Sequence, residues 1–137
     1  MITALWNIGV KTADLAADLA FLERVGATIV QRDVLPVDGG ETLDYAIVRL
    51  GGVRLLLFPS VIFEDQIPGG VAPGLTHAVF EVDDIQTEYE RIRGLGGQDL
   101  LAPRLAQAAF GSRQIAFFRS PGGLVLEIIQ ILENKVD

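Results

Sequence analysis

The pattern of apolar and polar positions along the chain occurs twice, at an offset of about 70 residues. Each copy begins with a short alternating segment, continues with an aspartate and an amphipathic run, and stops at a glycine. Alternation with period two is typical of a half-buried strand, and an aspartate before an apolar run at helical spacing is typical of a helix N-cap. The matched positions are residues 7–10 and 77–82, Asp14 and Asp84, and Gly26 and Gly96.

Each predicted helix carries one apolar stripe. Apolar residues follow the two aspartates in steps of four, three and three, which places them on a single helix face. They are Leu15, Leu19, Leu22 and Val25 in the first helix, and Ile85, Tyr89, Ile92 and Leu95 in the second. Gly26 and Gly96 are predicted to end the helices at the C′ position.

Three further strand-like segments follow each predicted helix. They are residues 28–35, 43–50 and 53–58 in the first half, and 99–102, 113–119 and 124–129 in the second. Each half is therefore predicted to fold as a βαβββ module. We expect one α+β domain over residues 1–137, with repeats at about 5–58 and 75–132 and a Pro/Gly-rich connector at 59–74.

Strand alternation predicts which side chains face the inside of the curved mixed sheet. The predicted helices would lie outside, over Ile8, Val10, Ala78, Phe80 and Val82. The opposite parity would point into the concave side: Asn7, Gly9, His77, Val79 and Glu81. Two modules that face each other would then enclose one cleft.

Composition narrows the classes of function. The formal net charge is -7, and such an acidic surface disfavours nucleic acid and anionic membranes as partners. The chain has no cysteine, which excludes disulfide scaffolds, thiolate metal sites and thiol nucleophiles. The N-terminus has no secretory signal pattern and no apolar run is long enough to span a bilayer, so we expect a cytoplasmic protein.

The paired strand–Asp–helix openings and the stretch from Phe110 to Glu127 resemble the vicinal oxygen chelate superfamily. This superfamily includes glyoxalase I, methylmalonyl-CoA epimerase, extradiol dioxygenases, and fosfomycin and bleomycin resistance proteins. The stretch looks like the closing hairpin of the family, in which a glycine precedes one strand and a Pro-Gly turn precedes a strand with a glutamate. Ser120 stands where the family usually has an acidic residue. The resemblance covers about Leu5 to Leu132.

The resemblance implies four metal-ligand positions, one on the first and one on the last strand of each module. Carried over, they are Asn7, Leu56, His77 and Glu127. His77 and Glu127 match the family pattern, whereas Asn7 replaces a histidine and Leu56 replaces a glutamate or glutamine. Two protein ligands would hold a divalent ion weakly, so the metal set is incomplete. Without metal, His77 and Glu127 could hydrogen-bond to each other and act as a dyad for proton transfer.

Other side chains are candidates for contact with a ligand. Arg54 and Phe58 share the strand face of Leu56, so Arg54 either meets an anion or Glu127 in the cleft or reaches solvent at the strand start. Arg113 is expected at the pocket rim, where it either meets a ligand or is exposed. The aromatic residues available to line an apolar pocket are Trp6, Phe58, Phe110, Phe117 and Phe118.

Two functions remain open. The favoured one is a glyoxalase/bleomycin resistance-like protein that binds a small molecule in the cleft, with a degraded metal site and ligand contacts at Asn7, Arg54, Leu56, Phe58, His77, Arg113 and Glu127. The alternative is a metal-dependent isomerase or lyase of the glyoxalase I or epimerase kind, in which His77 and Glu127 are catalytic. The resemblance also implies a homodimer.

Overall fold

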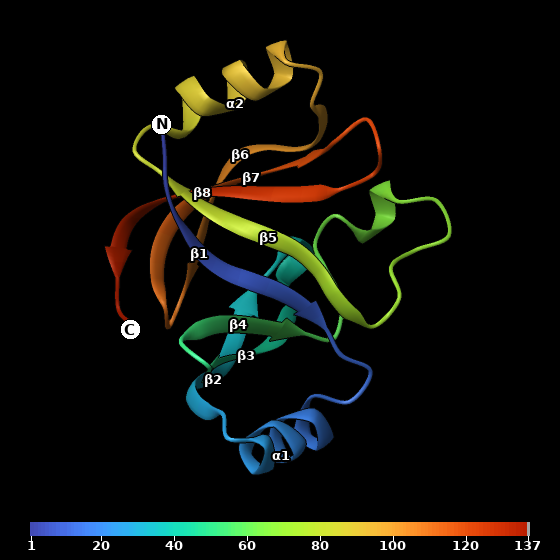
Figure 1. Ribbon diagram of the computed structural model, residues 1–137, viewed down its shortest axis with the longest axis vertical. Helices are drawn as coiled ribbons and strands as arrows, with labels where there is room; N and C mark the ends of the chain where they lie inside the picture. Colours follow the sequence, from blue (N-terminus) through green and yellow to red (C-terminus); the bar gives the residue numbers. More distant parts are fainter. Residues whose placement is uncertain (137) are drawn as a thin grey trace.

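The computed structural model describes residues 1–136, so the last residue of the expected domain lies outside it. Eight strands form one curved sheet in the order β2-β3-β4-β1-β5-β8-β7-β6, with a helix outside each half (Figure 1). The elements are β1 (Ile2–Lys11), α1 (Leu15–Val25), β2 (Thr28–Pro36), β3 (Thr42–Leu50), β4 (Val53–Phe58), β5 (Gly74–Val82), α2 (Ile85–Gly94), β6 (Gln98–Ala108), β7 (Gly111–Arg119) and β8 (Val125–Asn134). Short 3-10 turns lie at Asp38–Gly40 and Glu64–Gln66.

The sheet consists of two βαβββ modules that meet along β1 and β5, which confirms the predicted α+β fold. β1 and β5 run antiparallel at the centre of the sheet, side by side in Figure 1. Within each module the first and last strands are parallel neighbours, β1 with β4 and β5 with β8. The first and last strands of both modules therefore lie together in the middle of the sheet, where their inward-facing side chains can share one space.

Both helices begin where the sequence predicts and pack on the outer face. Asp14 accepts a hydrogen bond from the Ala17 amide at 3.0 Å, and Asp84 accepts one from the Thr87 amide at 3.2 Å. These contacts satisfy backbone donors that a helix N-terminus leaves free. No helix in residues 1–136 has the length and apolar character needed to cross a membrane.

The predicted apolar stripes are correct except at their last positions. Leu19 of α1 packs against Ala46, Val48 and Leu57, and Tyr89 of α2 occupies the corresponding place in the second module. Val25 is 54% exposed and Leu95 is 73% exposed, so their assignment to the buried stripes is wrong. Val25 is the last residue of α1, and α2 already ends at Gly94. Both side chains thus lie at the C-terminal ends of the helices, where they remain exposed to solvent.

The prediction for the outermost strand of the second module, residues 99–102, is too short. β6 runs from Gln98 to Ala108 and passes through Pro103. Proline lacks the amide hydrogen that a central strand needs, but β6 is an edge strand and pairs only with β7. A register shift between Leu101 and Arg104 accommodates the proline.

The connector between the modules folds back onto the concave side of the sheet. Val61 and Phe63 are 6% and 1% exposed and belong to the same apolar cluster as Val79 and Phe117. Lys11 at the end of β1 anchors this segment, because its Nζ donates to Glu64 Oε2 and to the Val71 carbonyl, both at 2.7 Å. The hydrogen bond from Lys11 lowers the pKa of Glu64. The Pro/Gly-rich segment thus covers part of the concave face of the sheet as well as linking the two modules.

Candidate functional site

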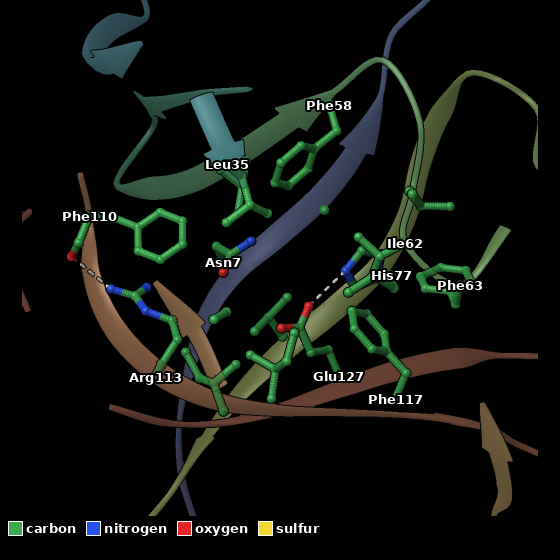
Figure 2. Close-up of a pocket in the computed structure, with 17 residues that line it drawn as sticks. Asn7, Leu35, Phe58, Ile62, Phe63, His77, Phe110, Arg113, Phe117 and Glu127 are labelled. Atoms are coloured by element: carbon green, nitrogen blue, oxygen red, sulfur yellow. Dashed lines mark hydrogen bonds and ion pairs between the residues drawn. The ribbon is translucent and has the colours of Figure 1, made fainter. Parts of the chain in front are cut away.

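The two modules and the connector enclose a small apolar chamber with a volume of about 60 Å³. All four positions of the expected ligand set line it: Asn7, Leu56, His77 and Glu127. Figure 2 labels three of them, Asn7, His77 and Glu127. Phe58 and Arg113 also line it, as do Phe110 and Phe117. The parity of the strands therefore brings side chains from β1, β4, β5, β7 and β8 to one space. Most of the remaining lining is aliphatic or aromatic.

His77 and Glu127 form a buried hydrogen-bonded pair. His77 Nε2 lies 3.1 Å from Glu127 Oε1, and the two side chains are 7% and 12% exposed. Edge-on ring contacts hold the imidazole, with centroid distances of 5.3 Å to both Phe63 and Phe117. Because β5 and β8 are parallel neighbours, the pair is fixed by two strands of one module and one residue of the connector.

The Thr76 hydroxyl completes this hydrogen-bond network. Its Oγ1 lies 2.7 Å from His77 Nδ1 and 3.0 Å from the Gly9 carbonyl oxygen. A hydroxyl has one proton to donate. It can donate to Gly9 and accept from a protonated Nδ1, or it can donate to an unprotonated Nδ1 while Nε2–H donates to Glu127. The network therefore accommodates the imidazole in both its neutral and its charged form.

Gly9 makes room for the imidazole. Gly9 is the cross-strand partner of His77 between β1 and β5, and the ring lies directly over its Cα. A Cβ atom at this position would lie 2.2 Å from His77 Cε1, far inside van der Waals contact. The backbone conformation of Gly9 is one that other residues can adopt, so the requirement for glycine here is steric.

Two buried donors of the chamber have no hydrogen-bond acceptor within residues 1–136. They are Nδ2 of Asn7 and Nε of Arg113, on side chains that are 3% and 6% exposed. Arg113 donates from one terminal nitrogen to the Phe110 carbonyl at 3.0 Å, and its guanidinium lies 4.3 Å from the centre of the Phe110 ring. Burial lowers the pKa of Arg113, and the negative charge of Glu127 opposes this effect. Of the two placements expected for Arg113, the exposed one is therefore excluded, and the side chain lines the chamber.

Arg54 lies outside the chamber, so of its two expected placements, entry into the cleft with Leu56 and reach to solvent at the strand start, the first is wrong. Its guanidinium lies 3.8 Å from the centre of the Trp6 ring and donates to the Trp6 carbonyl at 2.7 Å. Trp6, Arg54 and Glu81 line a separate surface cavity. Arg54 is the second residue of β4, and its guanidinium stacks on Trp6 instead of entering the chamber. Of the other aromatic candidates, Phe118 packs beneath α2.

Three residues that contact His77 are not among the candidate site residues from the sequence. Gly9 was expected to face inward, but only the register of β1 on β5 reveals its contact with His77. Thr76 immediately precedes the histidine and gave no signal of its own. Phe63 lies in a segment read as a connector, although the apolar run Val61-Ile62-Phe63 amid prolines and glycines indicated a buried stretch.

The match to a known family covers most of the chain. The model of the Glyoxalase/Bleomycin resistance protein/Dioxygenase superfamily matches residues 7–128. The chain belongs to this superfamily. A search of curated proteins found no match.

Solved structures with this superfamily's fold are similar over nearly the whole chain. A hypothetical protein from Bacillus halodurans C-125 is 19% identical, with a TM-score of 0.74 and 98% of each chain covered. A methylmalonyl-CoA epimerase variant from Streptomyces coelicolor, in complex with 2-nitronate-propionyl-CoA, is 19% identical, with a TM-score of 0.73 and coverage of 97% of this chain and 100% of that one. A 4-hydroxymandelate synthase variant from Streptomyces coelicolor is 21% identical, with a TM-score of 0.69 and coverage of 98% of this chain and 49% of that one. At these identities the similarity establishes the fold.

The donor set of this superfamily member does not fit a divalent metal ion. His77 and Glu127 can ligate, but their facing atoms are bonded to each other. Leu56 presents an apolar side chain to the chamber, and an amide is a poor ligand for a transition metal. Residues 1–136 hold no group of three or more His, Cys, Asp or Glu side chains that could coordinate a metal. The chamber instead contains the imidazole–carboxylate pair, two hydrogen-bond donors without an acceptor in residues 1–136, and a mainly apolar lining.

Proposed function

We propose that the chain binds a small molecule in the chamber between its two modules, without a metal ion. The observation that carries this proposal is the state of the four superfamily ligand positions. They line one chamber, yet Asn7 and Leu56 cannot serve a transition metal, and His77 and Glu127 bond to each other. An enclosed apolar space with a few convergent polar groups is typical of a small-molecule site.

The size of the chamber limits the bound group. A water molecule needs roughly 10–15 Å³ measured in the same way, so a volume of about 60 Å³ holds about four to six water-sized groups. A larger cavity of about 500 Å³ adjoins it and shares Leu35, Ile62, Ala106 and Ile115 with its lining. A compact ligand, or the compact end of a longer one, therefore fits the chamber. Large glycopeptide-like compounds do not fit inside it.

The outer cavity disfavours the coenzyme A esters bound by the epimerase structures. Its charged lining consists of Asp38, Glu41, Asp65 and Arg104, which gives three negative charges against one positive charge. Arg104 is already paired with Asp38 at 3.0 Å. Polyphosphate groups carry several negative charges and would be repelled from this cavity. The ligand is therefore proposed to lack a phosphorylated tail.

Metal analysis and a fragment screen test the proposal together. Protein purified without chelator should contain less than stoichiometric Zn, Ni, Mn or Fe, and calorimetry with Zn²⁺ or Ni²⁺ should show no saturable heat. Small fragments should raise the melting temperature of the wild type but not of Leu56→Trp, in which the new ring fills the chamber. Stoichiometric metal that disappears in His77→Ala would instead support a metal-dependent isomerase or lyase. Fragment shifts that persist unchanged in Leu56→Trp would place the binding site elsewhere.

A further inference from the structure

Ionisable side chains lie on two opposite sides of the chamber. Figure 2 shows the guanidinium of Arg113 on one side, the His77–Glu127 pair on the other, and the amide of Asn7 between them. Arg113 forms no ion pair with a carboxylate in the part of the chain that the structure describes, although Arg91 and Arg104 both do. The chamber thus contains a buried cation without a direct ion-pair partner among the described residues, although the negative charge of Glu127 acts on it.

A buried guanidinium without a partner is costly. A desolvated charge requires pairing and saturated hydrogen bonds, and a polar donor that is buried without an acceptor adds a further cost. One terminal nitrogen of Arg113 donates to the Phe110 carbonyl and lies 3.4 Å from Asn134 Oδ1. Nε of Arg113 has no acceptor among the described residues. Nδ2 of Asn7 is also free and belongs to the same chamber. Acceptor atoms carried by a ligand in the chamber would satisfy these donors.

We propose that Arg113 and Asn7 form a subsite for the carboxylate group of a small organic acid. This inference rests on the proposed small-molecule function and specifies its ligand class. The planar guanidinium matches carboxylate geometry, and an asparagine amide donates one further hydrogen bond. The aromatic faces of Phe58 and Phe110 then contact the short carbon chain. The volume of the chamber suits acids with about four to six non-hydrogen atoms.

The structure provides matched variants for the test. Arg113→Met removes the charge and keeps the volume, and Asn7→Leu removes the amide in a similar shape. Arg119 is the control, because its Nε is also buried and unpaired but its side chain does not line the chamber. Arg119→Met therefore removes an arginine of the same kind from elsewhere on β7.

The probes are propionate, propionamide and 1-propanol, titrated at constant ionic strength by calorimetry and by thermal shift. Wild type and Arg119→Met should bind propionate at least tenfold more tightly than propionamide. Arg113→Met should lose at least tenfold in propionate affinity, Asn7→Leu should lose severalfold, and neither should lose propionamide binding to the same degree. Arg113→Met should also melt at or above the wild-type temperature, because an apolar side chain replaces an unpaired buried charge.

Two outcomes separate the subsite from the chamber. If propionamide and 1-propanol bind as tightly as propionate and Arg113→Met changes nothing, the carboxylate subsite is wrong while the small-molecule chamber stands. If none of the three probes binds and the wider fragment screen also fails, the proposed function itself is wrong. A lower melting temperature in Arg113→Met with unchanged propionate affinity would assign Arg113 a structural role and overturn the subsite.

Discussion

The two modules share their outer faces and differ on their inner faces. The strand registers make Ala46 equivalent to Ala116 and Leu57 equivalent to Ile128, because Ala46 pairs with Leu57 and Ala116 pairs with Ile128. All four of these side chains are buried beneath a helix. The helices match as well, since Leu19 and Tyr89 occupy the same step after their N-caps. Packing of helix on sheet is therefore conserved between the repeats in kind, if not in residue identity.

The inner faces have diverged at nearly every matched position. Asn7 is equivalent to His77, Gly9 to Val79, and Leu56 to Glu127, because Gly9 pairs with Leu56 just as Val79 pairs with Glu127. Across the seam the large ring of His77 faces Gly9, and the smaller Asn7 faces Val79. The ligand position and the residue opposite it have thus changed together. The outer faces pack against helices in both modules, whereas the inner faces differ where they line the chamber.

Converting the first module into the second tests this comparison most strongly. The variant Asn7→His/Leu56→Glu/Val79→Gly places an imidazole and a carboxylate opposite His77 and Glu127, with a glycine beneath the new ring. A four-ligand site contributes roughly 10–16 kcal/mol of zinc binding, so two added ligands should raise Zn²⁺ affinity by at least about a thousandfold, or about 4 kcal/mol. Calorimetry with Zn²⁺ on protein shown to be folded by circular dichroism measures this gain.

The double variant Asn7→His/Leu56→Glu is the control for the role of Val79. Without the glycine, the new imidazole meets the Val79 side chain, and the gain in zinc affinity should be clearly smaller than in the triple variant. Equal affinities in the double and triple variants would contradict the equivalence of Gly9 and Val79.

The sequence alone predicts the outer face well and the inner face only in part. Helix caps, apolar stripes and the succession of helices and strands along the chain follow from local periodicity, which a duplicated chain shows twice. The inward direction of Asn7, His77 and Glu127 follows from strand parity and the family resemblance. The contact between Gly9 and His77 depends on the register of two strands about 70 residues apart in the sequence, and no local pattern specifies it. The sequence leaves the burial of Arg113 open because its contact with Asn134, 21 residues away in the chain, depends on the pairing of β7 with β8.

The variant Gly9→Ala, in the first module, should displace the imidazole of His77 in the second module. The new methyl group would overlap the imidazole, so His77 must rotate away from Glu127 and Thr76, at a cost of about 2 kcal/mol for overpacking. We expect a lower free energy of unfolding and at least tenfold weaker binding of any chamber ligand. Denaturant unfolding and the ¹⁵N signals of the imidazole measure the two effects.

The matched control is Gly97→Ala, because a Cβ at Gly97 would lie 2.7 Å from the Ile92 side chain beneath α2, away from the chamber. Gly97→Ala should also reduce stability and leave ligand binding unchanged. An unshifted imidazole signal in Gly9→Ala would show that the ring does not depend on this glycine.

The smallest expected effect is a loss of unfolding free energy at alkaline pH that arises from a residue of the first module. Tyr45 on β3 is fully buried and equivalent to Ile115 on β7, so only the first module carries a phenol at this inner position. Burial raises the pKa of Tyr45 to about 12 from the ordinary value of 10.0. Because the folded state keeps the proton that the unfolded chain releases, this contribution is complete below pH 10 and is lost as the pH rises toward 12. At pH 11 the loss is about 1.4 kcal/mol, from one pH unit above the unfolded pKa. Tyr45→Phe should therefore lose less stability than the wild type between pH 9 and pH 11 in denaturant titrations.

Tyr89 is the control in the second module, because its raised pKa arises from burial together with its hydrogen bond to Asp99 at 2.8 Å. Identical alkaline slopes in the wild type and Tyr45→Phe would show that the inner face of the first module does not hold the phenol neutral.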